Sequence, residues 1–289
     1  MSKTVLKDYL ILCKPKVILV MLVTTWVGMH LATVSFVPLD ILLFGTIGIA
    51  LSGGSAAVIN HLVDRHIDAK MARTENRPLV CKRVSLYQAA LFASILGVGG
   101  LLILSIFVNP LTAFLTFLTV IGYAVFYTIF LKRRTPQNIV IGGAAGAMPP
   151  LLGWTAVTGE LHALAWLPVL IIFTWTPPHF WALAIYRKED YQNAQVPMLP
   201  VTHGVPFTKL CMVLYTLLLF ALSLLPYATQ MSGIIYFTAA IVLGVGFLTH
   251  TLILYKSCSN PMALKTFSFS ITYLLLLFTA LLIDHYIQI

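Results

Sequence analysis

The sequence predicts an all-α polytopic membrane protein, a bundle of nine transmembrane helices, and three observations support this prediction. Hydrophobic residues make up 59% of the 289 residues and charged residues only 9%, whereas roughly a quarter of the residues in a soluble protein are charged. The mean hydropathy is +0.93. Apolar runs of about 20 residues, the length of a membrane-spanning helix, recur along the whole chain.

Nine such runs follow one another along the chain. The first comes after a basic N-terminal segment; it is too long for the apolar core of a signal peptide and has no clear small-residue cleavage site, so we expect a retained span. Pro149-Pro150 and Pro177-Pro178 interrupt the fifth and sixth runs, where helix breaks are expected. The runs lie at about 17–36, 41–62, 86–107, 111–130, 138–157, 163–185, 206–226, 232–254 and 264–286.

The distribution of basic residues predicts how the protein is oriented in the membrane. With nine spans, all 18 Lys and Arg residues fall on one side, in the connections or in the first residues of the following run, whereas eight or ten spans would divide them between both sides. By the positive-inside rule that side is the cytoplasm, so the N-terminus is expected inside and the C-terminus outside. The net charge of +9 therefore reflects topology rather than nucleic-acid binding. We expect an integral protein of a bacterial cytoplasmic (inner) membrane, with its two longest polar loops facing the cytoplasm.

The first of these loops begins with an unusually polar helix end. Asn60, Asp64 and Asp68 are spaced i, i+4, i+8, which places them on one helix face. Carboxylate and carboxamide oxygens are ligands for hard divalent cations, and carboxylates at membrane depth are costly and usually functional. Arg73 and Arg77 follow and offer guanidinium forks to phosphate. The pattern favours a magnesium–diphosphate site over a set of solvated loop charges.

The second long loop carries a weaker version of the same pattern. Glu189 and Asp190 lie beside basic residues, and of the two acids Asp190 is the favoured ligand. His179, Tyr186 and Asp190 follow i, i+7, i+11, so one helix face can present all three. His179 comes after the Pro-Pro pair and is either an interhelical hydrogen-bonding residue or a group facing a cavity.

Two further clusters have two explanations each. Lys132, Arg133 and Arg134 are either an ordinary positive-inside cluster or an anion-binding group. The same alternatives apply to Lys14 and Lys16. The small residues 142–146 are expected to let helices pack closely.

These motifs resemble a known family. Asn60-x3-Asp64-x3-Asp68-x4-Arg73-x3-Arg77-Pro78 resembles the first aspartate-rich motif of the UbiA-type intramembrane prenyltransferases. Ala194 stands where the wider family usually has the last acid of a second Asp-x3-Asp motif. In lacking this acid, the sequence resembles the haem-farnesylating branch of the family, the protohaem IX farnesyltransferases. The same branch is matched by the blocks Leu131–Gly143, Trp175–Trp181, Tyr186–Tyr191 and Val196–Pro200.

The resemblance implies one prenyltransferase domain, residues 1–289, with active-site loops at about 60–85 and 186–205. It implies transfer of farnesyl from farnesyl diphosphate to the 2-vinyl group of haem B, with addition of water, to make haem O. Mg²⁺ is the implied cofactor, and haem B is a substrate. The implied metal-binding and catalytic residues are Asn60, Asp64, Asp68 and Asp190, and the implied substrate-binding residues are Arg73, Arg77, Lys132, Arg133, His179, Tyr186 and Lys188.

Three alternative functions stay open at this point. A UbiA-type enzyme with another acceptor, such as a quinone precursor or chlorophyllide, fits less well because of Ala194 and the Pro-Pro-His block. A transporter would place its polar groups near the membrane midplane rather than at one mouth. A non-catalytic haem-binding assembly factor would not need the full carboxylate set. The expected partners are farnesyl diphosphate, haem B and membrane lipid; the sequence leaves open whether the product passes to a haem A synthase or directly to a terminal oxidase.

Overall fold

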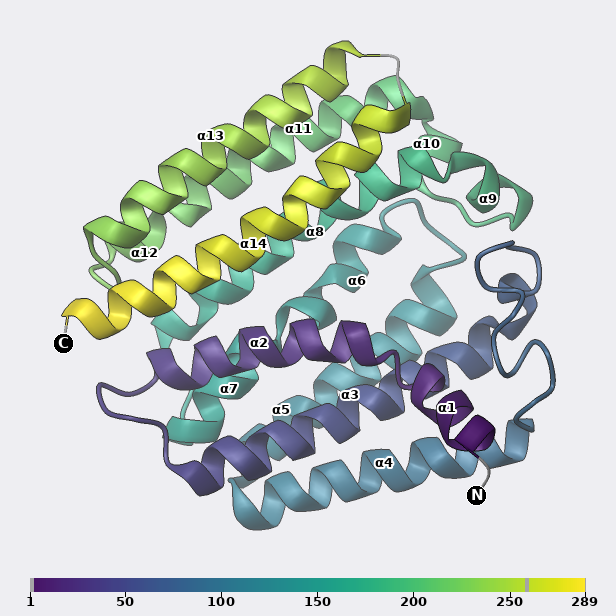
Figure 1. Cartoon of the computed structure of the whole chain (residues 1–289), viewed down its shortest axis with the longest axis horizontal. Helices are drawn as coiled ribbons and strands as arrows, with labels where there is room; N and C mark the ends of the chain where they lie inside the picture. The colour runs from purple at the N-terminus through teal and green to yellow at the C-terminus, as the bar shows by residue number, and fades with distance from the viewer. Residues whose placement is uncertain (1–2, 258–259, 289) are drawn as a thin grey trace.

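A computed structural model describes residues 3–257 and 260–288, and this part of the chain contains helices and loops without any β-strand. The helices pack side by side as a bundle (Figure 1). They are α1 (Lys3–Leu12), α2 (Pro15–Leu31), α3 (Leu39–Asp68), α4 (Leu86–Phe107), α5 (Pro110–Ile121), the π-helix η1 (Gly122–Leu131), α6 (Asn138–Ala147), α7 (Pro149–Thr158), the 3₁₀ turn η2 (Ala163–Ala165), α8 (Trp166–Tyr186), α9 (Lys188–Asn193), α10 (Leu199–Thr202), α11 (Gly204–Ser223), α12 (Leu225–Ala228), α13 (Ile234–Lys256) and α14 (Asn260–Gln288).

The all-helical membrane architecture agrees with the prediction from composition. Within the described residues, eight helical segments are long and apolar enough to cross a membrane, and a ninth is present if α1 and α2, bent by 49° at Cys13 and Lys14, count as one span. The two termini lie at opposite ends of the bundle (Figure 1). The number nine and the orientation of the termini across the membrane stay predictions.

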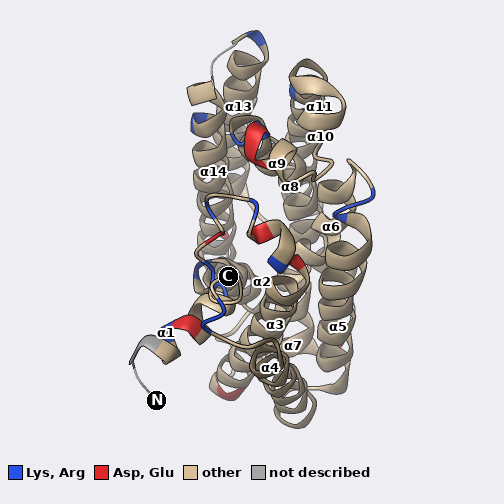
Figure 2. Cartoon of the chain, turned by 90° about the vertical axis from the view of Figure 1, so that its right-hand side faces the viewer, with Lys and Arg blue, Asp and Glu red and all other residues tan. Residues whose placement is uncertain are grey.

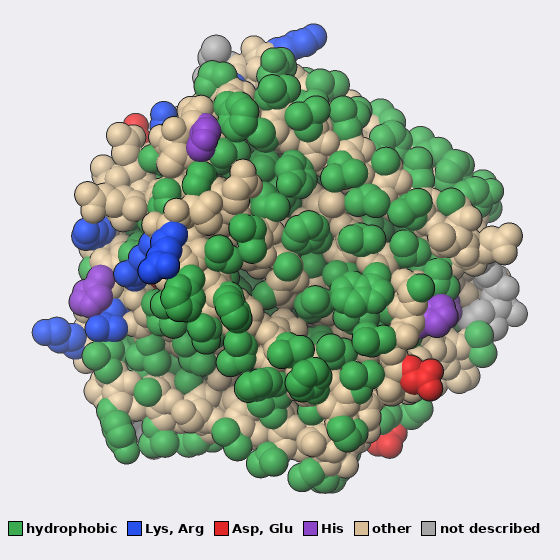
Figure 3. All heavy atoms as spheres, turned by 180° about the vertical axis from the view of Figure 1, so that it is seen from behind, with side chains coloured by type: hydrophobic (Ala, Val, Ile, Leu, Met, Phe, Trp, Pro, Cys, Tyr) green, Lys and Arg blue, Asp and Glu red, His purple; other side chains and the backbone are tan. Residues whose placement is uncertain are grey.

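The long loops and most of the polar groups lie at one end of the bundle. The loop after α3 and the short helices α9 and α10 lie together at the right-hand end of Figure 1. Figure 2 looks onto this end and shows Lys, Arg, Asp and Glu residues on its loops and helix ends. On the opposite face to that of Figure 1, hydrophobic side chains cover much of the surface (Figure 3), as expected where lipid is the solvent.

The two Pro-Pro pairs behave differently. The break predicted in the fifth span is present, because α6 ends at Ala147 and α7 begins at Pro149. The break predicted in the sixth span is wrong, since α8 continues through Pro177 and Pro178. α8 packs against α6, α11 and α14 and is largely buried. This packing holds the helix in place although two backbone N–H donors are missing.

The small residues predicted to allow close helix packing do so unevenly. A Cβ atom added to Gly142 would overlap the Tyr127 ring and one at Gly143 would press on Thr176, whereas one at Gly146 would meet open space. The closest approach is between α2 and α7. There a Cβ on Gly28 would overlap the carbonyl of Pro150, and a Cβ on Gly153 would overlap the carbonyl of Thr25. The backbones of α2 and α7 therefore touch directly.

This contact predicts that Gly153→Ala destabilises the protein by about 1–3 kcal/mol, because an added methyl group forces two packed backbones apart. Gly146→Ala on the neighbouring helix is the matched control; it meets open space and should leave stability unchanged or raise it through helix propensity. Thermal unfolding of both variants in the same detergent measures the difference. Equal melting temperatures for the two variants would contradict the described α2–α7 contact.

Candidate active site

The buried polar residues of α3 form the centre of the site. α3 continues without a break to Asp68, so Asn60, Asp64 and Asp68 lie along one helix. Their exposed fractions are 3%, 1% and 4%. Two carboxylates with so little exposure need cationic partners, because an isolated charge in a low-dielectric interior is very unfavourable.

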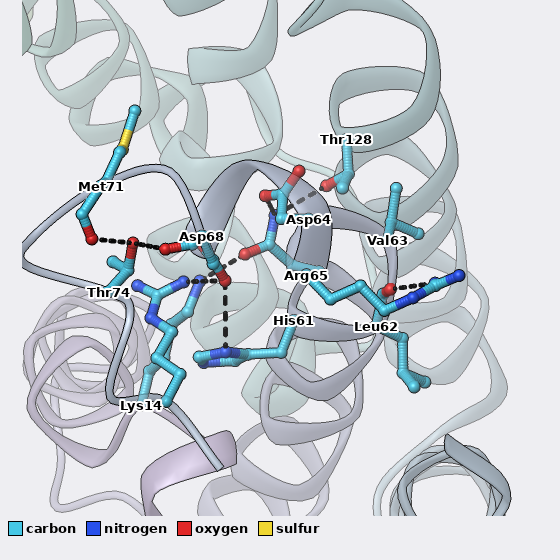
Figure 4. Close-up of polar contacts among 12 residues, drawn as sticks. Lys14, His61, Leu62, Val63, Asp64, Arg65, Asp68, Met71, Thr74 and Thr128 are labelled. Atoms are coloured by element: carbon cyan, nitrogen blue, oxygen red, sulfur yellow. Dashed lines mark hydrogen bonds and ion pairs between the residues drawn. The ribbon is translucent and has the colours of Figure 1, made fainter. Parts of the chain in front are cut away.

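Three cations meet this α3 face. Lys132 Nζ lies 2.5 Å from Asp64 Oδ2, and Arg77 Nη1 lies 2.6 Å from Asp68 Oδ2. Lys14 Nζ donates to Asn60 Oδ1 at 2.5 Å. Figure 4 shows Lys14, Asp64 and Asp68 gathered at this end of α3. Of the two arginines that follow the motif in sequence, Arg77 thus lies directly against it.

Each of these cations comes from an irregular segment. Lys14 occupies the break between α1 and α2 with left-handed backbone angles (φ 51, ψ 60). Lys132 follows the π-helix η1 directly, and its N–H bonds back to Tyr127 O. Arg77 lies in the loop after α3, where the Thr74 hydroxyl donates to Asp68 O at 2.8 Å. Lys14 and Lys132 thus contact the α3 motif itself, and their anion-binding role stays a prediction.

The loop that carries Arg77 is tied to the helices on both sides. Arg83 donates through Nε to Asp8 of α1 at 3.1 Å and through Nη2 to Asn76 O at 3.0 Å. Ser85 and Gln88 form a capping box at the start of α4, which fixes where the loop ends. These contacts hold the loop, and with it the Arg77 guanidinium, against α3.

Two groups beside the carboxylates were not identified as functional from the sequence. His61 is 2% exposed, and its Nδ1 lies 4.0 Å from Asp68 Oδ2. Thr128, in the middle of η1, accepts a hydrogen bond from Asn60 Nδ2 at 3.2 Å. A π-helix often occurs at a functional site, but its residues have the same hydropathy as an α-helix, so the sequence pattern did not reveal it.

Arg73 and Asp190 lie in a separate small pocket of about 60 Å³, lined by Met71, Arg73, Leu183, Arg187, Asp190 and Tyr191. Asp190 Oδ2 lies 3.5 Å from Arg187 Nη1. Burial raises the pKa of the Tyr191 phenol further above neutral pH, and the protonated phenol can donate a hydrogen bond. In the described residues Arg73 has no hydrogen bond or ion pair, and an anion in this pocket would meet a free guanidinium.

The residues around Asp64 suit a hard divalent cation. Asp64 Oδ2 is held by Lys132 and Asn60, but its Oδ1 atom is buried and has no partner. An unpaired carboxylate oxygen is both costly and a suitable ligand for Mg²⁺. Across residues 3–257 and 260–288, no three His, Cys, Asp or Glu side chains are grouped as a metal site. The structure thus keeps Asp190 with Arg187 rather than with the α3 carboxylates.

The remaining predicted substrate-binding residues have different surroundings. Arg133 Nη2 donates to Val63 O at 3.1 Å. The guanidinium of Arg187 lies 5.2 Å from the centre of the Tyr186 ring, at the end of α8. Lys188 is the first residue of α9.

His179 lies in an aromatic stack within the bundle. Its ring is stacked between Trp175 and Phe267, with centroid distances of 4.1 and 4.6 Å. His179 Nδ1 is 2.6 Å from Ser270 Oγ, and the Ser270 hydroxyl donates to Phe267 O. Ser270 Oγ must therefore accept from Nδ1–H, which leaves the lone pair of the imidazole on Nε2.

Comparison with known proteins agrees with the motifs. The UbiA prenyltransferase family model matches residues 21–281. A protoheme IX farnesyltransferase of Legionella pneumophila (strain Paris) is 61% identical over 97% of this chain and 95% of that protein. A protoheme IX farnesyltransferase of Saccharophagus degradans (strain 2-40) is 56% identical over 97% of this chain and 93% of that protein.

Solved structures show the same fold at low sequence identity. Digeranylgeranylglyceryl phosphate synthase aligns with a TM-score of 0.83 at 20% identity, covering 98% of this chain and 99% of that one. A UbiA homologue from Archaeoglobus fulgidus bound to DMAPP and Mg²⁺ aligns with a TM-score of 0.66 at 18% identity, covering 95% and 99%. On the family model and the relatives at 56–61% identity, the chain belongs to the UbiA prenyltransferase family, among the protoheme IX farnesyltransferases.

Proposed function

We propose that this protein transfers the farnesyl group of farnesyl diphosphate to the 2-vinyl group of haem B, with addition of water, to make haem O. The observation that carries the proposal is the buried Asp64–Asp68 pair with Lys14, Arg77 and Lys132 against its face. The names of the relatives at 56–61% identity support the acceptor. The UbiA homologue with bound DMAPP and Mg²⁺ supports a metal-dependent use of a prenyl diphosphate.

Asn60, Asp64 and Asp68 would hold the Mg²⁺, which once bound supplies Lewis-acid stabilisation of the diphosphate. Asp190 is the proposed fourth ligand, and it would have to leave its ion pair with Arg187 to reach the metal. The protein's own cations act on the same group. When the allylic C–O bond breaks, the leaving diphosphate gains negative charge. Arg77 and Lys132 can donate charge-assisted hydrogen bonds to its oxygens. The vinyl group then attacks the allylic cation, water adds to the porphyrin-side cation, and a proton is released.

The apolar bundle supplies the rest of what the reaction needs. The farnesyl chain is a hydrocarbon, so burial in the interior is favourable, and an interior without bulk water protects the allylic cation from hydrolysis. His179, with its lone pair on Nε2, is the proposed contact to haem iron. Arg73, Arg133, Tyr186 and Lys188 complete the proposed substrate-binding set. The membrane is proposed to be the bacterial inner membrane, with the site facing the cytoplasm.

The direct test is to incubate the purified protein with haem B, farnesyl diphosphate and Mg²⁺ and to identify the porphyrin product by mass. We expect haem O, and we expect chelation of the metal to stop its formation. Asp64→Asn and Asp68→Asn should each lower the rate at least about 100-fold, because a metal ligand worth several kcal/mol is lost. Asp40→Asn, an exposed acid in the first turn of α3, is the control and should keep full activity.

Two outcomes would count against the proposal. Full activity in either α3 variant would remove the carboxylate pair as the metal site. Prenylation of a quinone precursor or chlorophyllide, with no haem adduct, would replace haem as the acceptor while leaving the prenyl-diphosphate site intact.

The basic cluster 132–134 allows a matched comparison. Lys132 contacts Asp64, whereas the Arg134 guanidinium lies over the Phe130 ring. Lys132→Gln should raise KM for farnesyl diphosphate by about tenfold or more, since a charge-assisted hydrogen bond contributes roughly 1.5–3 kcal/mol. Arg134→Gln should leave KM unchanged. Steady-state kinetics at saturating haem measures KM for both variants. Equal changes in KM would mean that the three basic residues only orient the protein in the membrane.

His179→Ala tests the haem contact. The variant should bind haem with an altered absorption spectrum, because one axial nitrogen ligand is lost. His250→Ala is the control, since His250 lies on α13, stacks on Phe269 at 4.1 Å and has its Nδ1 bonded to Gly246 O. An unchanged haem spectrum in the His179 variant would leave this histidine as a structural residue in the aromatic stack.

A further inference from the structure

Thr128 is completely buried and sits at the centre of the π-helix η1. Its hydroxyl donates to Tyr123 O at 2.8 Å, the carbonyl five residues earlier, which is the spacing of a π-helix. A hydroxyl has one proton, so the Thr128 oxygen can act only as an acceptor toward its other neighbour. That neighbour is Asn60, whose amide nitrogen lies 3.2 Å away.

The other two partners of Asn60 require the same orientation of its carboxamide. The Asp64 carboxylate only accepts, and it lies 2.8 Å from Asn60 Nδ2. The Lys14 ammonium only donates, and it lies 2.5 Å from Asn60 Oδ1. Rotating the amide by 180° would bring two acceptors together on one side and two donors together on the other. The network thus identifies which atom is nitrogen and which is oxygen.

This orientation determines which oxygen of Asp64 remains available. Asn60 Nδ2 and Lys132 Nζ both donate to Oδ2 of Asp64, so Oδ1 is left buried without a partner. The π-helix brings both groups to α3, because Thr128 and Lys132 are one turn apart on the same stretch. If the helical turn before Lys132 held one residue fewer, the Lys132 side chain would be rotated by about 100° around the helix axis. It would then point away from Asp64.

We infer that Thr128 is a positioning residue that holds the Asn60 carboxamide with its nitrogen toward Asp64, and so directs Asp64 Oδ1 to the divalent cation. Thr128 itself touches neither the cation nor the substrate. The inference rests on the proposed function only in taking a divalent cation and a diphosphate as what the site binds. It requires neither farnesyl transfer nor haem as the acceptor.

The test compares Thr128→Ser with Thr128→Ala in the full-length protein in lipid nanodiscs. Both variants lack the methyl group and differ only in the hydroxyl. Mn²⁺ affinity is measured in the presence of inorganic diphosphate from the loss of the EPR signal of the free ion. The affinity should fall about tenfold in Thr128→Ala, because a hydrogen bond that orients a metal ligand is lost. It should stay near the wild-type value in Thr128→Ser. Thr119→Ala is the matched control, because its hydroxyl bonds only to Leu115 O within α5.

A double-mutant cycle separates positioning from packing. In an Asn60→Ala background there is no amide to orient, so Thr128→Ala should then change the Mn²⁺ affinity no further. Wild-type affinity in Thr128→Ala, or equal losses in the Ala and Ser variants, would overturn the inference. Absence of haem farnesylation by the wild-type protein, with the Mn²⁺ affinities of the variants as expected, would instead count against the proposed function alone.

Discussion

The burial of two carboxylates at the end of α3 is the constraint on which this end of the molecule depends. Asp64 and Asp68 are 1% and 4% exposed, and removing the partner of a buried charge costs about 3–5 kcal/mol. Lys132 and Arg77 supply those partners, from segments that are distant from each other in sequence. The loop after α3 and the end of η1 must therefore reach the same helix face before the buried charges are stable.

Two irregular segments of the backbone supply partners to this face of α3. Lys14 adopts left-handed angles between α1 and α2, and η1 has π-helical geometry. Unusual backbone of this kind costs free energy and persists only where the surroundings compensate for it. Here the compensation is direct, because each irregular segment ends with a side chain placed against Asn60 or Asp64.

Much of this arrangement could be predicted from sequence, for physical reasons that also explain the failures. Helical periodicity correctly put Asn60, Asp64 and Asp68 along one helix, because α3 is continuous. Hydropathy found the apolar helices but cannot distinguish a π-helix from an α-helix, so Thr128 was missed. The Pro-Pro rule failed at Pro177 because tertiary packing outweighs a local preference. Sequence also does not reveal that Asp284 is 1% exposed and accepts the N–H groups of Gly233, Ile235 and Tyr236 at the start of α13.

The contact between α2 and α7 has a consequence for the route of a long hydrocarbon chain. At Gly28 and Gly153 the two backbones touch with no side chain between them. Side chains can rotate to let a flexible molecule pass, but two hydrogen-bonded backbones in contact cannot open without separating the helices. The seam between α2 and α7 is therefore closed to lipid tails at these positions. An isoprenoid that enters the bundle sideways from the bilayer therefore cannot pass between α2 and α7 at these positions.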